Sequence, residues 1–507
     1  MHQLEEYIRF EAEKLLKRHQ KYARVLIDES RRRARRTASP PAVVNAHEPS
    51  HWTCDSGFNP YYVRTRVESM AYALEKSIRA GTYRPRPAVG YQVPKIDGTL
   101  RDVSVFQIAD SALSRLVFKS LSKKNGSLLG SRCYAYRTDL TVHDAILHIA
   151  SEFRGRDRIF IAEYDFRKYF DQITHDHILK IFRDRMLFIS SAEEQIVRSF
   201  LRAPTLSISN YNTPNPSLRE RGIPQGTSIS LFLANAAASP IDKRLERLGV
   251  GFARYADDTV IWSSSYAEIC RAAEELAAAA SEMGVEVNLL KSEGIRVLTP
   301  SGAPAEMKST TSISFLAHRI DSKTIGIKGK KIASLKKHIT YLMYVNLLQP
   351  LIRGVFNSAR ILPNFDRDYL VFIMQLRRYL YGSVSETQLR RHLAGDIPLL
   401  RFYGLMSFYP TITDEDQLIE LDGWLLSSIH RTLVKRAALF RANGVQILPL
   451  PHDLDRNDLL PLHSTTSSGT FVDLRIPSFR RIAALVRNTA QVYGPTAVAH
   501  PSTRYYS

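Results

Sequence analysis

Two adjacent aspartates stand between apolar residues in the stretch RYADDTVIW, residues 254–262. Val260 and Ile261, which follow the acids, are typical of a buried β segment that turns at the acid pair. Neighbouring carboxylates repel each other, and burying a charge without compensation is costly. The pattern therefore predicts a strand–turn–strand with Asp257 and Asp258 at its tip and a positively charged group beside them.

A second acidic strand end lies upstream, in the stretch IFIAEYDFRKYFDQITHD. Its Asp165 follows an apolar strand and precedes a predicted helix start. One acid at a strand end and an acid pair at a hairpin tip can converge as three carboxylates, which are hard oxygen ligands of the kind Mg²⁺ prefers. Two such ions can clamp the attacking and leaving oxygens of an in-line phosphoryl displacement. We interpret the acids as a divalent metal site, with Mn²⁺ as an alternative ion.

The chain is strongly basic, with 70 Lys and Arg against 50 Asp and Glu and a formal net charge of +20. An excess of this size points to a polyanionic partner, most simply nucleic acid, and a merely soluble basic protein is the alternative. The length of 507 residues and the hydrophobic content of 44% allow a sizeable core. Two or three domains are expected at roughly 100–200 residues each.

The sequence also predicts where the protein resides. Its three cysteines, Cys54, Cys133 and Cys270, have neither a zinc-binding nor a disulfide spacing, which fits a reducing compartment. The N-terminal stretch is a charged amphipathic helix and not a signal peptide. No apolar run approaches the roughly 20 residues that cross a bilayer. We expect a cytoplasmic protein with no membrane contact.

The expected secondary structure changes at three points along the chain. Residues 1–59 form a basic helical extension, which ends in RRRARR, and a proline-containing linker. Residues 60–325 alternate helix-like and strand-like runs. Residues 326–450 are helical, and residues 451–507 hold short segments and a tail.

Several motifs, taken in their order along the chain, carry a family resemblance. YDFRKYFDQITHD, GIPQGTSISLFLANAAASPID and YADD resemble palm motifs of bacterial reverse transcriptases of the group II intron and retron type. MGVEVNLLKSEG, ISFLAHRI and VPKIDGTLRDVSV are similar to the helix–strand, primer-grip and fingers segments of the same enzymes. The resemblance covers residues 60–340. It implies an α+β right-hand polymerase core of fingers and palm, in which helices back an antiparallel palm sheet, with a large all-α C-terminal domain.

The same resemblance implies an RNA-directed DNA polymerase, a nucleotidyltransferase that uses dNTPs, an RNA template and two Mg²⁺ ions and makes DNA. Asp165, Asp257 and Asp258 then form the catalytic, metal-binding carboxylate triad. Phe170 lies where the family carries an aromatic steric gate, whose ring crowds a 2′-hydroxyl and favours dNTPs. A helix cap at Asp165, a solvated turn at the acid pair and a core position for Phe170 are the alternatives.

Five further residues match nucleotide-binding positions of the family. Lys95 and Arg101 correspond to the fingers' basic pair that holds the incoming triphosphate, although both could be surface cations on a hairpin. Lys291 corresponds to a proton donor to pyrophosphate. Gln225 and Gly226 correspond to the segment near the nascent base pair and template, where glycine allows close approach of the backbone. A tight turn is the alternative for that pair.

The chain also departs from the family. Ala317 stands where the primer-grip segment usually has glycine, and Ser230–Leu231 stands where the family reads S-P. GKKIASLKKHITYLMY is the thumb candidate, and the helical region continues well beyond a usual thumb. No maturase zinc or HNH signature is present. This architecture resembles the abortive-infection and unknown-group reverse transcriptases of phage defence, which implies an antiviral role with an associated noncoding RNA.

Two basic or aromatic segments fall outside these motifs. RRRARR could grip a structured RNA through its phosphates, or it could be a solvated helix end. Tyr505 and Tyr506 in the tail could serve as a protein primer for synthesis, although an inert tail or an oligomer contact is the alternative. The sequence leaves a homo-oligomer open.

Three rival functions remain. A polymerase of the same fold could extend DNA without a template. An RNA-dependent RNA polymerase is a second rival, against which Phe170 and the YADD motif argue. The third is a catalytically silent RNA-binding scaffold in abortive infection, against which the intact acid triad argues.

Overall fold

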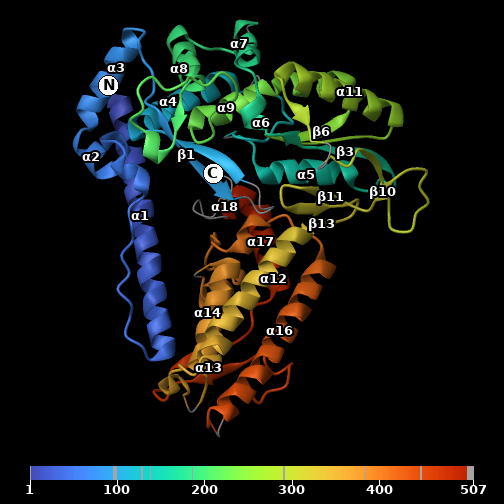
Figure 1. Cartoon of the computed structure of the whole chain (residues 1–507). Helices are drawn as coiled ribbons and strands as arrows, with labels where there is room; N and C mark the ends of the chain where they lie inside the picture. The colour runs from blue at the N-terminus through green and yellow to red at the C-terminus, as the bar shows by residue number, and fades with distance from the viewer. Residues whose placement is uncertain are drawn as a thin grey trace. The chain divides into compact units, whose positions relative to one another are not determined.

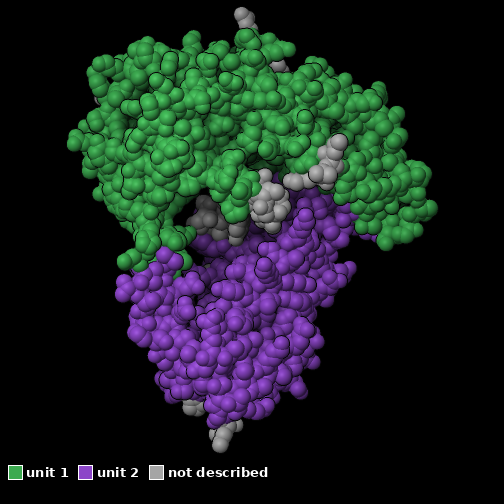
Figure 2. Space-filling model, viewed as in Figure 1, with its two compact units in different colours: residues 1–25, 45–152, 156–311 green, residues 26–44, 153–155, 312–507 purple. Residues whose placement is uncertain are grey.

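A computed structural model describes residues 2–94, 100–126, 129–137, 139–184, 187–288, 292–362, 364–382, 384–445 and 448–498. The chain forms two compact units (Figure 2). Unit 1 comprises residues 1–25, 45–152 and 156–311, and unit 2 comprises residues 26–44, 153–155 and 312–507. No helix in these described ranges is both long and apolar enough to cross a membrane.

Unit 1 is built around a five-stranded sheet with the strand order β10-β9-β3-β7-β6 (Figure 1). The strands are β3 (Ile159–Tyr164), β6 (Gly251–Tyr255), β7 (Asp258–Ser263), β9 (Ile295–Leu298) and β10 (Ser309–Thr310). All neighbours are antiparallel except β9 and β10. β3 and β7 carry buried Ile, Val, Phe and Trp side chains and lie inside the sheet, with a strand on each side.

A second, three-stranded sheet in unit 1 has the order β2-β1-β5. Its strands are β1 (Ala88–Pro94), β2 (Leu100–Val105) and β5 (Thr205–Leu206). β1 and β2 pair antiparallel from Val89–Val105 to Pro94–Leu100. A short pair, β4 (Phe166–Arg167) and β8 (Glu286–Val287), follows the end of β3.

Helices cover these sheets and supply the core of unit 1. α11 (Tyr266–Met283) packs on β3 and β7 through an apolar face that repeats every three or four residues. The Ser265 side chain caps its first turn, and Gly284 ends it in the left-handed conformation. The other helices are α2 (Pro60–Thr65), α3 (Val67–Arg79), α4 (Ile108–Asn125), α5 (Val142–Phe153), α6 (Tyr169–Gln172), α7 (His175–Arg183), α8 (Ser191–Leu201), α9 (Ser228–Ala237) and α10 (Ser239–Leu248). α1 (His2–Thr37) supplies residues to both units.

Unit 2 is mostly helical, which confirms the predicted helical region. Its helices are α12 (Gly329–Met343), the π-helix η5 (Tyr344–Leu348), α13 (Gln349–Ile352), α14 (Arg367–Tyr381), α15 (Glu386–Leu393), α16 (Glu415–Ala442), α17 (Phe479–Tyr493) and α18 (Pro495–Val498). α12, α14 and α16 pack side by side around one apolar core (Figure 1). Leu335, Ile339 and Met343, four residues apart, are the buried stripe of α12.

Unit 2 also contains two small sheets. β11 (Ile313–Phe315), β12 (His318–Ile320) and β13 (Ile325–Ile327) form an antiparallel meander, and β14 (His463–Thr465) pairs with β15 (Phe471–Asp473). The β11–β12 turn is the predicted primer-grip segment. Leu316 and Ala317 occupy its two central positions with φ of 46° and 68°. The boundaries predicted at residues 59, 325 and 450 stay predictions.

Candidate active site

The two adjacent aspartates lie at the tip of the β6–β7 hairpin. The two strands pair as far as Tyr255 and Asp258, so Ala256 and Asp257 form a two-residue turn. Ala256 has a φ of 58°, in the left-handed region that alanine adopts at a cost of about 1–2 kcal/mol. Asp257 is half-buried and Asp258 is exposed. The strand–turn–strand expected from the sequence is therefore present, with both acids accessible.

Asp165 is brought to the same end of the sheet by strand register. β3 and β7 pair antiparallel, and their last recorded pair is Tyr164 with Thr259. The next position toward this end of the sheet is Asp165 after β3 and Asp258 at the start of β7. Asp165 is half-buried, and its amide N–H donates to the Ser292 hydroxyl at 3.3 Å. The sheet therefore collects the three predicted carboxylates at the ends of two neighbouring strands and in the turn beside them.

A divalent cation fits this arrangement by its chemistry. Asp165, Asp257 and Asp258 offer only carboxylate oxygens, and all three remain accessible. Among the described residues, no three His, Cys, Asp or Glu side chains, these acids included, are placed to hold a metal ion by themselves. Mg²⁺ is usually held by one or two carboxylates together with water and substrate phosphates. These acids would thus supply part of a shell that a nucleotide completes.

Tyr136 lies beside Tyr255, the last residue of β6 before the turn that carries Asp257. Its ring lies 6.2 Å from the Tyr255 ring. Burial raises the pKa of the Tyr136 hydroxyl, the negative charge of Asp257 raises it further, and the positive charge of Arg101 opposes both. The charges of Arg101 and Asp257 therefore both act on the Tyr136 hydroxyl, in opposite directions.

Sequence reasoning did not single out Tyr136. It lies in the segment GSRCYAYRTDL, which runs beside β6: the Tyr134 amide donates to the Arg254 carbonyl at 2.9 Å. Tyr136 also has a φ of 56°, a left-handed conformation that is uncommon for an aromatic residue.

The predicted pair Gln225–Gly226 rests against β2. The Ser104 amide donates to the Gln225 carbonyl at 2.6 Å. Gly226 has a φ of 137°, and a Cβ at this position would lie 2.1 Å from the Ser104 carbonyl oxygen. Only glycine satisfies both requirements. The Gln225–Gly226 segment therefore rests on β2, the strand that also carries Arg101.

Phe170 lies in α6, half-buried, with its ring edge-on to the Tyr169 ring at 5.8 Å. Its carbonyl accepts a hydrogen bond of 2.7 Å from the Ile223 amide. This bond ties the segment that follows Asp165 to the segment that leads into Gln225. Phe170 therefore belongs to the same part of unit 1 as the acids, and its role as a steric gate stays a prediction.

Four predicted residues lie outside the described residues. They are Lys95 and Lys291, for which nucleotide contacts are expected, and Tyr505 and Tyr506, the candidate priming tyrosines. Their roles stay predictions.

A buried ion pair between Arg254 and Asp242 stabilises the β6–β7 hairpin, and the sequence analysis did not predict it. Arg254 of β6 is fully buried and donates to both carboxylate oxygens of Asp242 at 2.6 Å. The same guanidinium donates to the Asn235 side chain and to the Ala256 carbonyl, each at 3.1 Å. Burial alone would lower the pKa of Arg254, but the charge of Asp242 outweighs it and the net pKa is raised. Arg254 is therefore charged and holds the turn that carries Asp257.

A signal for this pair was present in the sequence. Arg254 interrupts an otherwise apolar strand, and a buried arginine requires a carboxylate partner. Nothing in the spacing identified Asp242, twelve positions away on α10, as that partner.

Comparison with known proteins gives one family match. Residues 93–320 match the family model described as reverse transcriptase (RNA-dependent DNA polymerase). This range contains all three acids, Arg101 and the Gln225–Gly226 segment.

Two curated relatives share 27% and 24% sequence identity with this chain. Protein YkfC of Escherichia coli (strain K12) is 27% identical over 217 residues, which cover 41% of this chain and 54% of the relative. The group II intron-encoded protein LtrA of Lactococcus lactis subsp. cremoris is 24% identical over 259 residues, which cover 50% of this chain and 41% of LtrA. This chain therefore matches about half or less of the length of these relatives.

Among solved structures, telomerase from Candida albicans in complex with a fragment of telomeric RNA is 13% identical, with a TM-score of 0.38. That alignment covers 78% of this chain and 69% of the telomerase. Apo telomerase from Candida tropicalis, truncated from its C-terminal domain, is also 13% identical, with a TM-score of 0.36 over 52% of this chain and 60% of the other.

Proposed function

We propose that this chain, which carries a reverse transcriptase domain over residues 93–320, is an RNA-directed DNA polymerase. The observation that carries the proposal is the register of β3 and β7, which sets Asp165 one residue beyond the Tyr164–Thr259 pair and next to Asp258. Asp257 stands in the adjoining turn. Acids at neighbouring strand ends within a matched polymerase segment support metal-assisted phosphoryl transfer.

Each residue of the site has a proposed task. Asp165, Asp257 and Asp258 would hold two Mg²⁺ ions, which when bound neutralise the triphosphate and lower the pKa of the attacking hydroxyl. Arg101 binds the triphosphate, with Lys95 as its predicted partner. Phe170 excludes a 2′-hydroxyl and so selects dNTPs.

The remaining tasks concern the template and the leaving group. Gly226 gives the nascent base pair room beside the backbone, with Gln225 next to it. Lys291 protonates the departing pyrophosphate.

The wider role that we propose is antiphage defence, with a noncoding RNA as template or scaffold. The proposal is supported by the resemblance to defence reverse transcriptases, by the helical unit 2 and by the net charge of +20. A plaque assay tests it. Cells that express the chain should resist phage, and cells that express the Asp257→Asn, Asp258→Asn double variant should not. Full resistance with the double variant would favour a silent RNA-binding scaffold.

The polymerase proposal is tested by primer extension on an RNA template with an annealed DNA primer. The wild-type chain should extend the primer with dNTPs and not with rNTPs, and only when Mg²⁺ or Mn²⁺ is present. The Asp257→Asn, Asp258→Asn double variant should lose at least ~10²-fold in rate, because it removes charges that face the reacting phosphates.

Asp157→Asn is the matched control. This exposed acid precedes β3 where Asp165 follows it, so its loss should leave the rate unchanged. Extension without template would indicate a template-independent polymerase, and incorporation of rNTPs would indicate an RNA polymerase. Either result overturns the proposal.

A further inference from the structure

The basic run at the end of α1 belongs to unit 2 and is held there rigidly. Arg36 is buried, with 7% of its surface exposed, and donates to the Asn346 side chain at 2.7 Å. Asn346 lies in the π-helix η5 and is itself fixed by bonds to Leu342 and Gln375. The Asn357 amide N–H donates to the Arg36 carbonyl at 3.0 Å. The helix end is therefore a structural part of unit 2.

Arg36 is a buried cation whose only recorded side-chain partner is a neutral amide. Burial lowers its pKa, and the more distant charge of Asp368 opposes this effect. Within the described residues no carboxylate lies within ion-pair distance of its guanidinium, which has five N–H donors. A buried guanidinium usually has a carboxylate or another anion as partner. Here none of the described residues supplies such an anion at ion-pair distance.

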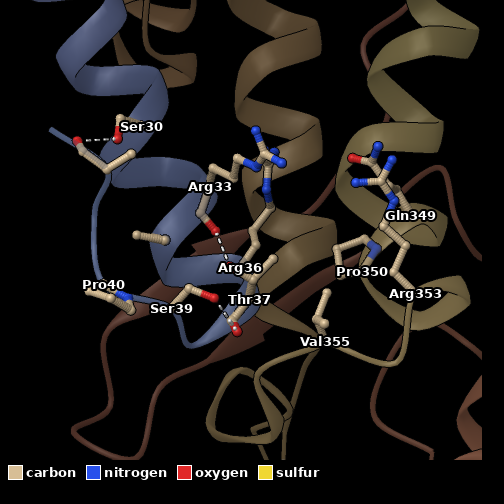
Figure 3. Close-up of a pocket in the computed structure, with 12 residues that line it drawn as sticks. Ser30, Arg33, Arg36, Thr37, Ser39, Pro40, Gln349, Pro350, Arg353 and Val355 are labelled. Atoms are coloured by element: carbon tan, nitrogen blue, oxygen red, sulfur yellow. Dashed lines mark hydrogen bonds between the residues drawn. The ribbon is translucent and has the colours of Figure 1, made fainter. Parts of the chain in front are cut away.

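A first cavity lies beside Arg36, with a volume of about 480 Å³ (Figure 3). The guanidinium-bearing residues Arg33, Arg36 and Arg353 line it, and Pro40 and Pro350 give it apolar walls. None of its described lining residues is acidic. Arg33 and Arg353 are exposed and form no ion pair with any described residue. The cavity thus combines unneutralised cations with flat apolar surface.

A second cavity of about 370 Å³ shares Arg36 with the first. Arginines supply most of its wall, because five of its eight described lining residues are Arg32, Arg35, Arg36, Arg360 and Arg367. Of these, Arg32, Arg35 and Arg367 have no carboxylate partner in the described parts of the chain. Such a wall suits phosphate oxygens, which guanidinium groups bind in a bidentate manner.

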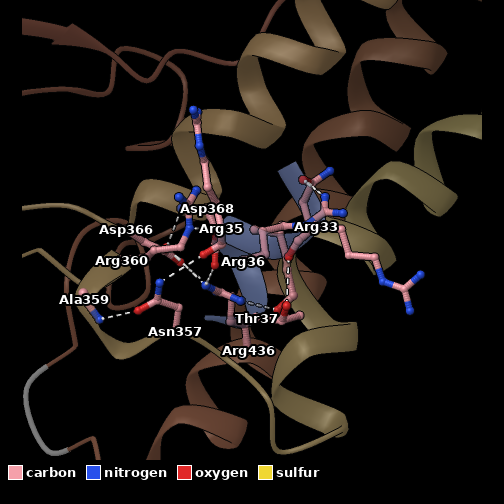
Figure 4. Close-up of polar contacts among 12 residues, drawn as sticks. Arg33, Arg35, Arg36, Thr37, Asn357, Ala359, Arg360, Asp366, Asp368 and Arg436 are labelled. Carbon is pink, nitrogen blue, oxygen red and sulfur yellow. Dashed lines mark hydrogen bonds and ion pairs between the residues drawn. The ribbon is translucent and has the colours of Figure 1, made fainter. Parts of the chain in front are cut away.

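The acids near this second cavity are already neutralised (Figure 4). Arg436 binds Asp366 at 2.6 Å and Asp368 at 3.1 Å, and Arg360 binds Asp368 at 2.5 Å. His452 also contacts Asp366, at 2.9 Å. These two acids are therefore paired with Arg436 and Arg360, and the charges of Asp368 and Glu29 act on Arg36 only from beyond ion-pair distance.

We propose that the two cavities form a binding site for the phosphate backbone of single-stranded RNA, with the first cavity taking a nucleoside between its prolines. Six guanidinium groups without carboxylate partners, spread over two adjoining cavities, match a chain of regularly spaced phosphates better than one isolated anion. The apolar residues Pro40, Pro350 and Val355 of the first cavity match a ligand that carries a base as well as phosphates. The site uses no residue of the acid-bearing sheet. Its phosphate chemistry is independent of the proposed polymerase function, and the choice of RNA rests on that function.

The test is fluorescence anisotropy with full-length protein, freed of nucleic acid at high salt, and a labelled single-stranded RNA of mixed sequence. The Arg32→Ala, Arg35→Ala and the Arg33→Ala, Arg353→Ala double variants should each bind RNA at least roughly tenfold more weakly. A plot of the logarithm of the RNA association constant against the logarithm of salt concentration has a negative slope. Each variant should make this slope shallower by about 1.4, because two phosphate contacts are lost.

Arg24→Ala, Arg31→Ala is the matched control. It removes the same number of charges, both from α1, and neither residue lines either of these two cavities. Its affinity should change less than roughly threefold. Equal losses in the control and the cavity variants would overturn the site, because binding would then follow net charge alone. Inorganic tripolyphosphate that competes as well as RNA at equal phosphate concentration would also overturn it, in favour of a free polyphosphate ligand.

Photocrosslinking provides a measurement that does not depend on the folding of variants. RNA that contains 4-thiouridine should crosslink to peptides within residues 30–42 and 349–371, and crosslinks confined to other segments would contradict the proposal. The two proposals fail separately. A chain that binds RNA through these arginines but extends no primer refutes the polymerase only. A chain that extends primers but binds RNA equally well without the arginines refutes this site only.

Discussion

Replacement of Asp242 by alanine is expected to loosen the hairpin that carries the acid pair. Arg254 would remain charged and fully buried while losing both carboxylate bonds of 2.6 Å. The bond from Arg254 to the Ala256 carbonyl at 3.1 Å, which steadies the turn, would then depend on an unpaired guanidinium. The change therefore links a buried ion pair in α10 and β6 to the position of Asp257.

The expected cost follows from burial. Asp242 and Arg254 have exposed side-chain fractions of 1% and 0%, so neither charge is relieved by water. Breaking a buried pair by removing one partner costs about 3–5 kcal/mol. The Asp242→Asn variant should cost nearly as much, because its NH₂ group would face a guanidinium N–H. Replacing both residues together, as Asp242→Leu with Arg254→Met, should cost clearly less than Asp242→Ala alone, because no buried charge is left unpaired.

Native-state hydrogen exchange over residues 251–263 measures the opening free energy of the hairpin directly. The matched control is Glu282→Ala, which breaks the ion pair of 2.6 Å with Arg244, two positions after Asp242 on α10. That pair is half-exposed, so its loss should cost about 1 kcal/mol or less. A loss of less than about 1 kcal/mol for Asp242→Ala, or a double variant that costs the sum of the two single changes, would refute the reasoning.

Three other changes have defined outcomes. Gly226→Ala places a Cβ 2.1 Å from the Ser104 carbonyl oxygen and should push β2 away. Steady-state kinetics should then show a KM for dNTPs that is raised roughly tenfold. An unchanged KM would show that this contact does not position Arg101. Ala317→Gly removes the strain of a left-handed alanine, whose φ is 68°, at a modest entropic cost. Urea unfolding should show unit 2 stabilised by up to about 1 kcal/mol. A destabilised variant would contradict this expectation. Burial alone would raise the pKa of Glu193, but hydrogen bonds from Lys124 and neighbouring serines lower it to about 2. Because the folded pKa lies below the unfolded one, this stabilisation of about 3 kcal/mol is fully present above pH ~4.5 and is lost as the pH falls through ~2. The stability difference between wild type and Glu193→Gln should therefore shrink over that window, and a constant difference would count against it.

The positions of the acids could be predicted from the sequence because they depend on local patterns. Apolar runs identified the strand that ends before Asp165 and the strand–turn–strand that carries Asp257 and Asp258. The register of β3 on β7 could not be read from those patterns. That register comes from the structure alone.

The supporting residues could not be predicted because their partners are distant in the sequence. Arg36 bonds Asn346 across 310 positions, and Arg254 bonds Cys133 across 121. Tyr136 gains its importance from burial beside Asp257, which no local pattern encodes. The positive charge of the run RRRARR likewise does not reveal that Arg36 is buried or that the neighbouring arginines line cavities.

Sequencing of the nucleic acid that co-purifies with the protein tests the central claim most directly. RNA and DNA would be sequenced from cells that express the wild-type chain and from cells that express Asp257→Asn. An RNA-directed DNA polymerase predicts a discrete RNA in both samples and complementary DNA in the wild type alone. DNA that matches no RNA, or the same complementary DNA with the variant, would contradict RNA-templated synthesis at these acids.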